Sequence, residues 1–259
     1  MAILPDALLA RIEDAGLNAS AVPQQRWLDG WLLRLSPGKI KRARCIHALA
    51  EGRLELDERL GLAQAAYAEA GLRTMFRLTP FTCPAALDAE LAAHGFVAED
   101  DTRVMVRPSL AGARPPGLPP GLAWRSLDAT AFAETVGALR GSPLEHRRVH
   151  AERLALSPVP YRAFAIADAA TGAVLCCGQA AREGALVGLY DIFTAPQARG
   201  QGLASLLCER MLSDSASEGV EVAYLQVDAV NAAARAVYRR LGFADAYAYH
   251  YRVAAAGVR

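Results

Sequence analysis

A glycine-rich segment at residues 199–204, with the sequence RGQGLA, is the part of the chain best suited to bind an anion. It follows an apolar run that ends near Thr194 and precedes a stretch in which apolar residues recur at helical spacing. The first amides of a helix have no intrahelical partner and lie at the positive end of its dipole. Gly200 and Gly202 let the backbone approach an anion without a Cβ clash. We therefore predict a pyrophosphate site here, with an ordinary glycine-rich turn as the alternative.

The spacing within this loop narrows the class of ligand. The loop lacks the Gly-Lys-Ser/Thr ending of nucleotide triphosphatases and the Gly-X-Gly-X-X-Gly spacing of dinucleotide-binding folds. The pattern Arg199-X-X-Gly202-X-Ala204 after a strand resembles the coenzyme A loop of the GNAT acetyltransferase superfamily. Residues 231–243 (NAAARAVYRRLGF) are similar to that superfamily's Asn-X-X-Ala-X-X-X-Tyr-X-X-X-Gly-Phe segment. The resemblance covers about residues 122–259 and implies an N-acetyltransferase domain with acetyl-CoA as cosubstrate.

The resemblance implies backbone roles in two segments. The pantetheine arm of coenzyme A would pair, like an added strand, with Ile192, Phe193 and Thr194. Backbone amides would hold the pyrophosphate along the whole loop, namely at Arg199, Gly200, Gln201, Gly202, Leu203 and Ala204. Asn231 would reach the pantetheine or its neighbouring carbonyls. Asn is also a good N-cap for the helix that follows, and both roles can hold at once.

Tyr238 is the side chain to which the resemblance assigns catalysis. It would lie near the thioester sulfur and protonate the departing thiolate, which is the work of a general acid. The alternative is a core aromatic residue that shares a helix face with Ala234 and Leu241.

The general base for the amine is left open among three residues. Many members of the superfamily carry Glu just before Asp on the strand that leads to the loop, and here Tyr190 precedes Asp191. Because successive strand residues alternate between faces, we expect only one of these two side chains to face the acceptor. Glu145 and His146 are the other candidates, on the helix that borders the acceptor groove in this fold.

Two other kinds of chemistry find little support. His146 and His150 share a helix face, but the sequence has no His-Glu-X-X-His pattern, and Arg147 and Arg148 add positive charge beside them. We therefore expect no metal site. The five cysteines have no evident histidine partner, so we expect direct attack of the amine rather than a covalent enzyme intermediate.

The elements expected from residue 122 onward alternate between helical and strand periodicity. They form the order ααβββαβαβ, a mixed α/β fold, at residues 131–139, 144–156, 161–167, 173–181, 185–194, 202–217, 222–227, 232–241 and 243–253. At the amino end, residues 1–16 read as an amphipathic helix rather than as a secretory signal.

A proline- and glycine-rich segment at residues 111–121 divides the chain into two predicted domains, 1–110 and 122–259. A shift of 147 residues places His94-Gly95-Phe96 on Leu241-Gly242-Phe243 and residues 75–78 on 222–225. This single offset holds from about residue 31 to residue 107, so we predict an internal duplication: two GNAT-like folds in tandem, the first truncated and degenerate. The alternative is two unrelated α/β halves with similar endings.

The first half lacks the residues that carry chemistry in the second. Under the shift, Gly202 falls on Glu55, Asn231 on Pro84 and Tyr238 on Leu91. We expect the Glu55 carboxylate to lie where an anion would bind, so the first domain would be structural or would shape the substrate site. The basic run at residues 39–44 is predicted to be the solvent-facing side of a hairpin that turns at residues 36–38, with nucleic-acid contact as a minor alternative.

Bulk properties limit the remaining classes of function. The formal net charge of +1 provides no global attraction to nucleic acid or to acidic membranes, and no stretch reaches the roughly 18 apolar residues of a membrane span. An odd number of cysteines without a Cys-X-X-Cys pair favours reduced thiols and a cytoplasmic protein. The predicted function is acetyl transfer from acetyl-CoA to a small-molecule or peptide amine. The alternatives are a non-catalytic acyl-CoA sensor and a protein-interaction module.

Overall fold

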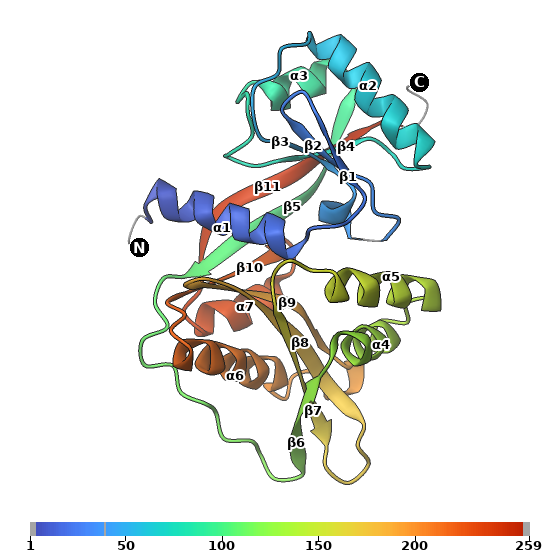
Figure 1. Cartoon of the computed structure of the whole chain (residues 1–259). Coiled ribbons are helices and arrows are strands. Elements are labelled where there is room, and N and C mark those ends of the chain that lie inside the picture. Colours follow the sequence, from blue (N-terminus) through green and yellow to red (C-terminus); the bar gives the residue numbers. More distant parts are fainter. Residues whose placement is uncertain (1–3, 39, 256–259) are drawn as a thin grey trace. The chain divides into compact units, whose positions relative to one another are not determined.

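The computed structural model describes residues 4–38 and 40–255 of the chain (Figure 1). The chain divides into two compact units. Unit 1 comprises Met1–Ala19, Val104–Val227 and Asn231–Ala246, and unit 2 comprises Ser20–Arg103, Asp228–Val230 and Tyr247–Arg259. This division differs from a simple cut at residues 111–121, because residues 104–110 belong to unit 1 and residues 228–230 to unit 2. The first helix belongs to unit 1, and most of the last strand belongs to unit 2.

Unit 1 contains the helices and strands predicted between residues 131 and 241, each within a few residues of its expected bounds. Its elements are α1 (Asp6–Ala19), β6 (Leu122–Leu127), α4 (Ala129–Leu139), α5 (Leu144–Ala155), β7 (Tyr161–Asp168), β8 (Val174–Glu183), β9 (Leu186–Thr194), α6 (Leu203–Ser217), β10 (Val222–Asp228) and α7 (Ala232–Arg240). Strand β6 was not predicted; it pairs in antiparallel fashion with β7 from Leu122↔Asp168 to Leu127↔Ala163. The segment 111–121 contains neither helix nor strand.

The strands of unit 1 follow the order β10-β9-β8-β7-β6. Strands β9 to β6 pair in antiparallel fashion, whereas β10 pairs with β9 in parallel. The parallel pairing runs from Val222↔Leu186 to Leu225↔Leu189 and then stops. Beyond Leu189, the β10-facing edge of β9 therefore has no pairing strand among the described residues. This edge lies directly before the glycine loop.

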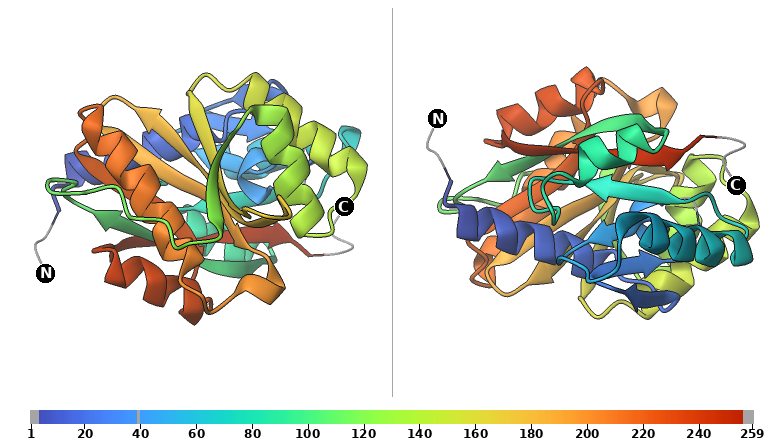
Figure 2. Two further views of the ribbon diagram at one scale, coloured as in Figure 1. Left: turned by 90° about the horizontal axis from the view of Figure 1, so that it is seen from below. Right: turned by 90° about the horizontal axis from the view of Figure 1, so that it is seen from above.

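Helices cover both faces of these strands (Figure 1; Figure 2, left). Side chains alternate along β8, so Cys176 packs in the cluster formed with α6 and α7, whereas Cys177 packs in the cluster formed with α4 and α5. Leu207 and Tyr238 belong to the first cluster, and Phe132 belongs to the second. The two faces thus carry different parts of the predicted chemistry.

Unit 2 also combines strands and helices. Its elements are β1 (Gln25–Leu28), β2 (Trp31–Arg34), the 3-10 turn η1 (Lys41–Ala43), β3 (Ile46–Ala48), α2 (Leu56–Glu69), β4 (Met75–Leu78) and α3 (Leu87–Ala93), together with parts of β5 (Phe96–Arg107) and β11 (Ala244–Ala254). Here, α2 and α3 pack in a single core cluster. The strands follow the order β1-β2-β3-β4-β11, and β4 pairs with β11 in antiparallel fashion from Leu78↔His250 to Met75↔Val253. The last strand, expected to complete the second domain, therefore extends into unit 2.

The basic run at residues 39–44 does not form the predicted hairpin arm. Lys39 lies outside the described residues, and residues 41–43 form η1. The ammonium nitrogen of Lys41 lies 2.9 Å from a carboxylate oxygen of Glu99 and 2.9 Å from one of Asp100. The charge of Lys41 is thus neutralised within unit 2.

The 147-residue offset relates elements as well as sequence. Shifted by 147, β4 falls on the start of β10, and β5 falls on residues 243–254, which contain β11. Helix α2 falls on residues 203–216, which lie within α6. This correspondence supports the predicted duplication. None of the helices described here is long and apolar enough to cross a membrane.

Candidate active site

The glycine loop is exposed at the amino end of α6, as predicted. Gly200 and Gly202 have φ values of 78° and 77°, a left-handed conformation that glycine adopts without strain. A Cβ at either position would meet no atom within 4 Å, so the space beside the backbone is open. The amides of Gly200, Gln201 and Gly202 donate no hydrogen bond to the described part of the chain. The loop therefore offers free donors at the positive end of a helix.

The segment that leads to the loop offers a second set of backbone groups. Ile192, Phe193 and Thr194 are half-buried, and Phe193 and Thr194 pair with β8 at Cys177 and Cys176. Their other edge lies beyond the end of the β9–β10 pairing. An extended ligand can therefore add to β9 there as a further strand.

A β-bulge at Asp191 changes which side chains share a face. Gln179 pairs with Tyr190 and Cys177 with Phe193, so two residues of β9 lie opposite Gly178 alone. Asp191 has a φ of 53°, and its side chain accepts a hydrogen bond of 2.9 Å from Gln179, the residue paired with Tyr190. Tyr190 and Asp191 therefore point to the same face. The expectation that they alternate was wrong, because a bulge interrupts the two-residue repeat of a strand.

Asp191 is the centre of a charged cluster built from three elements. Arg140, at the end of α4, donates a hydrogen bond of 2.8 Å to Oδ1 of Asp191. His150, on α5, places Nε2 3.5 Å from Oδ2. Burial by itself raises the pKa of Asp191, but His150 and Arg140 lower it more, so this pKa lies well below its usual range. A carboxylate held in this way is a weak base.

His150 is the histidine that the structure brings to this cluster, and the sequence had suggested it only as a poor metal ligand. Its side chain is 13% exposed, but Nε2 itself is buried. The exposed surface therefore belongs to other atoms of the side chain. Of the predicted candidates, Glu145 is exposed in the first turn of α5, and His146 has a buried Nδ1 without a hydrogen-bond partner among the described residues. Neither has a contact with Asp191 that would mark it as the base.

Tyr238 lies on the other face of the strands, in the cluster with α6. Its ring packs against that of Phe243 with the centroids 6.1 Å apart. Tyr238 therefore also contributes to the core, as the alternative interpretation of this residue expected. Burial raises the pKa of the Tyr238 hydroxyl well above its usual value, and the nearby Cys208 and Cys176 thiols act in the same direction. The hydroxyl group has no hydrogen-bond partner in residues 4–38 and 40–255. It is therefore a protonated donor at neutral pH.

Asn231 caps helix α7. Its Oδ1 accepts a hydrogen bond of 3.1 Å from the amide of Ala234, and the residue is exposed. The N-cap role expected for this residue is confirmed.

In unit 2, the segment equivalent to the glycine loop is already occupied by a carboxylate. Asp29 accepts hydrogen bonds from the amide of Arg53 at 2.9 and 2.8 Å and from the amide of Leu54 at 2.9 Å. Glu55, the residue predicted to block this position, precedes α2 as its N-cap but makes no capping hydrogen bond through its side chain. The blocking carboxylate is therefore Asp29. It is distant in sequence from the segment that it blocks, and the 147-residue shift compares only equivalent positions, so the shift could not identify it.

The cysteine that has a histidine beside it is not an accessible nucleophile. Sγ of Cys45 lies 3.4 Å from Nε2 of His47, so the inference that no cysteine has a histidine partner was wrong. Both side chains are buried in unit 2, with exposures of 0% and 3%. A substrate therefore has no access to this pair. Within the described residues, no group of three His, Cys, Asp or Glu side chains is arranged to hold a metal ion.

Comparison with protein families identifies one model along most of the chain. Residues 8–252 match the family described as "Probable histone acetyltransferase Rv0428c C-terminal". Comparison with curated protein sequences gives no match.

Solved structures show the same fold at low sequence identity. A GCN5-related N-acetyltransferase from Kribbella flavida is similar with a TM-score of 0.69 and 17% identity, covering 96% of each chain. A tandem GNAT protein from the clavulanic acid biosynthesis pathway has a TM-score of 0.62 and 16% identity over 80% of this chain and 72% of its own. A GCN5-related N-acetyltransferase from Sphaerobacter thermophilus has a TM-score of 0.55 and 20% identity over 70% of this chain and 59% of its own.

Proposed function

Because the chain belongs to the family of the probable histone acetyltransferase Rv0428c C-terminal region, within the GNAT superfamily, we propose that it transfers an acetyl group from acetyl-CoA to a primary amine. In this proposal, residues 122–259 form the catalytic domain and residues 1–110 are structural or shape the substrate site. The amine attacks directly, without an acyl-enzyme intermediate.

One observation carries the proposal: free loop amides lie next to an unpaired strand edge. The exposed amides of Gly200 to Gly202 suit a pyrophosphate, and the rest of the loop, from Arg199 to Ala204, would complete the cradle. The edge of β9 at Ile192, Phe193 and Thr194 suits an extended amide-containing arm. Acetyl-CoA contains both groups and supplies the acetyl group as a thioester.

We assign the removal of the amine proton to His150, with Asp191 as a positioning residue. Asp191 is a poor base because its pKa is lowered by His150 and Arg140 against the opposing effect of burial. A proton on Nε2 of His150 would face the carboxylate and leave Nδ1 as the acceptor nitrogen. The 13% exposure of the side chain supports access to a substrate amine. Asp191 then keeps the ring in the required tautomer.

Tyr238 is assigned the proton that completes the reaction. Its raised pKa keeps the hydroxyl protonated at neutral pH, and its lack of a partner among the described residues leaves the proton available for a thiolate. In this scheme, the amine loses one proton to His150, and the departing sulfur gains one proton from Tyr238. The turnover closes when His150 releases its proton to solvent and the Tyr238 phenolate takes up a proton from solvent.

The family description suggests which acceptors to test first. It names a histone acetyltransferase, so the ε-amino group of a lysine in a basic peptide belongs in the panel beside small amines and peptide N-termini. The test follows free thiol release from acetyl-CoA over this panel, with Tyr238→Phe as the matched variant. Turnover by the wild-type protein that falls in Tyr238→Phe supports the proposal.

A non-catalytic acyl-CoA sensor is the second candidate. Tyr190 favours it, because it stands where many members of the superfamily carry a Glu, and the neighbouring Asp191 carboxylate is paired with Arg140. Tight coenzyme A binding without turnover on any amine would favour the sensor. The interaction-module alternative has less support, because Lys41 of the basic run is paired with Glu99 and Asp100.

The cellular location is proposed from the thiols. All five cysteines are free, and four of them are buried. Free thiols are typical of a reducing compartment, so we propose the cytoplasm.

A further inference from the structure

Three arginines line a pocket of about 440 Å³ in unit 1, away from the glycine loop. Arg107 comes from the end of β5, Arg114 from the segment at 111–121, and Arg240 is the last residue of α7. Glu209 of α6 is the one acidic residue of the lining. The lining thus has an excess of two positive charges in a chain whose formal net charge is only +1.

These arginines lack ion-pair partners. Within residues 4–38 and 40–255, neither Arg107 nor Arg114 nor Arg240 forms an ion pair with a carboxylate. Arg107 donates instead to the carbonyl oxygens of Ser109 at 3.0 Å and Leu241 at 3.1 Å, which holds its side chain in place. Arg114 and Arg240 are exposed. The pocket therefore has one fixed and two adjustable guanidinium groups.

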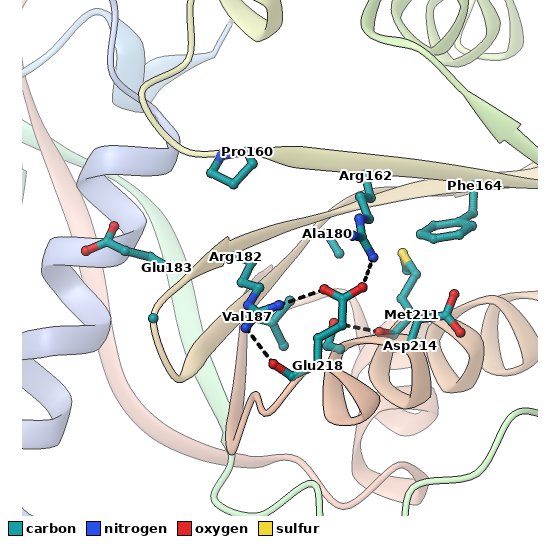
Figure 3. A pocket seen from close by; sticks show the side chains of 12 residues that line it. Pro160, Arg162, Phe164, Ala180, Arg182, Glu183, Val187, Met211, Asp214 and Glu218 are labelled. Atoms are coloured by element: carbon teal, nitrogen blue, oxygen red, sulfur yellow. Dashed lines mark hydrogen bonds and ion pairs between the residues drawn. The ribbon is translucent and has the colours of Figure 1, made fainter.

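A second pocket in the same unit shows what a neutralised arginine pair looks like (Figure 3). It has a volume of about 500 Å³ and is lined by Arg162 and Arg182. Both arginines bond to the carboxylate of Glu218, and Arg182 also donates to its backbone oxygen at 2.6 Å. The guanidinium donors there already have an anion from the chain itself. In the three-arginine pocket, no arginine is paired with a carboxylate of the described residues, the lining Glu209 included.

We propose that the three-arginine pocket binds a small phosphate-bearing anion. Guanidinium groups bind phosphate oxygens in a bidentate manner, and their cost of desolvation is lower than that of ammonium groups. A volume of about 440 Å³ suits a small molecule. A doubly charged anion would neutralise the net charge of the lining.

This pocket is separate from the proposed coenzyme A site. Helix α7 begins just after Asn231, near the proposed pantetheine site, and the pocket lies at its other end, at Arg240. A helix of nine residues is about 13 Å long. On α6, the lining residues Glu209 and Leu212 are likewise two to three turns beyond Gly202. Coenzyme A held at the loop would thus leave the pocket free for a second ligand.

The test titrates inorganic pyrophosphate into the full chain with coenzyme A at saturation, so that the loop is already occupied. We expect one further pyrophosphate per chain, bound more weakly as salt rises. In the double variant Arg114→Gln/Arg240→Gln, we expect at least a tenfold weaker pyrophosphate complex and unchanged coenzyme A affinity. Arg162→Gln removes an exposed arginine that already has a partner, and this control should bind like wild type.

A parallel titration with ADP separates two sources of the phosphate. A tighter complex with ADP than with pyrophosphate would identify a nucleotide, and equal affinity would identify the free anion; both support the site. No pyrophosphate binding by the coenzyme A complex of the wild-type chain would overturn it. A loss of coenzyme A affinity in the double variant would also overturn it, because the pocket would then serve coenzyme A itself.

Discussion

Asp29 binds the backbone amide of Arg53 through both of its carboxylate oxygens, at 2.9 and 2.8 Å. Arg53 is the residue that the 147-residue shift places on Gly200 of the proposed coenzyme A loop. The two halves of the chain thus use equivalent backbone segments differently. In unit 2 it holds a carboxylate of the chain, whereas in unit 1 its amides are free for a ligand.

The Asp29 contact should make stability depend on pH. Hydrogen bonds from the amides of Arg53 and Leu54 lower the pKa of Asp29 in the folded protein. Because an unfolded Asp has a pKa of about 3.9, this contact stabilises the fold above that pH, and the stabilisation is lost as pH falls below it. Asp29→Asn should therefore lower the melting temperature clearly at pH 7 and much less near pH 3.

The control for this prediction is Asp14→Asn, which alters an exposed ion pair with Arg11. Exposed pairs contribute little, so its melting temperature should follow that of the wild type at every pH. An Asp29→Asn difference that stays constant from pH 7 to pH 3 would contradict the assigned carboxylate contact.

Gly202→Glu should abolish coenzyme A binding, measured by calorimetry, while wild type binds one coenzyme A per chain. The new side chain places a carboxylate at the anion site, and its φ of 77° also strains the backbone. Gly219→Glu is the matched control, because Gly219 has a φ of 82° and open space around it but lies at the far end of α6. The control should lose stability to a similar extent and still bind coenzyme A.

This pair of variants also tests the number of sites. One coenzyme A bound by Gly202→Glu with normal affinity would place the site elsewhere in the chain. Two equivalent sites in wild type would show that Asp29 does not close the corresponding segment of unit 2.

Tyr238→Phe should lower the turnover rate by about 10²–10⁴, the range of general acid catalysis, with nearly unchanged acetyl-CoA affinity. The ring and its packing against Phe243 remain, so the melting temperature should change little. Tyr67→Phe is the opposite control. Its buried hydroxyl donates to the carbonyl oxygen of Arg34 at 2.9 Å, so that variant should lose about 1–3 kcal/mol of stability and keep its turnover per folded molecule.

Full activity of Tyr238→Phe at saturating acceptor would rule out the acid role. A lower melting temperature with turnover retained would leave Tyr238 as a core residue only.

His150→Gln should reduce turnover most strongly at the pH at which the wild-type enzyme is fastest. It should also remove the limb of the pH–rate profile that belongs to the base. Coenzyme A affinity should stay unchanged, because the residue lies on α5, away from the loop. His146→Gln is the matched control one helical turn away on the same helix. Equal losses in the two variants, or an unchanged pH profile in His150→Gln, would exclude His150 as the base.

Asp191→Leu should destabilise unit 1 by about 1–3 kcal/mol, since it leaves the buried amide of Gln179 without its acceptor and removes the partner of the exposed Arg140. Arg140 would lose its 2.8 Å partner, and Gln179 its 2.9 Å acceptor. The double variant Asp191→Leu/Arg140→Leu should recover part of this loss in chemical denaturation. Additive effects of the two changes would show that the pair contributes no coupling energy.

Local patterns in the sequence determined much of this protein. The glycine loop at the start of α6, the N-cap at Asn231 and the order of elements after residue 130 follow from glycine conformation, capping chemistry and side-chain periodicity, all of which act over a few neighbouring residues. The 147-residue offset likewise needed only the order of residues, and it anticipated the matching positions of β5 and β11.

The tertiary structure decided how distant residues meet. The bulge at Asp191 depends on the register between β8 and β9, and it turned a predicted alternation into a shared face. The cluster of Asp191 with Arg140 and His150 joins three separate elements, and the contact of Asp29 with Arg53 joins the turn after β1 to the segment before α2. Periodicity reports only which face a side chain takes on its own element. Which partner it finds there depends on how elements remote in the chain pack together.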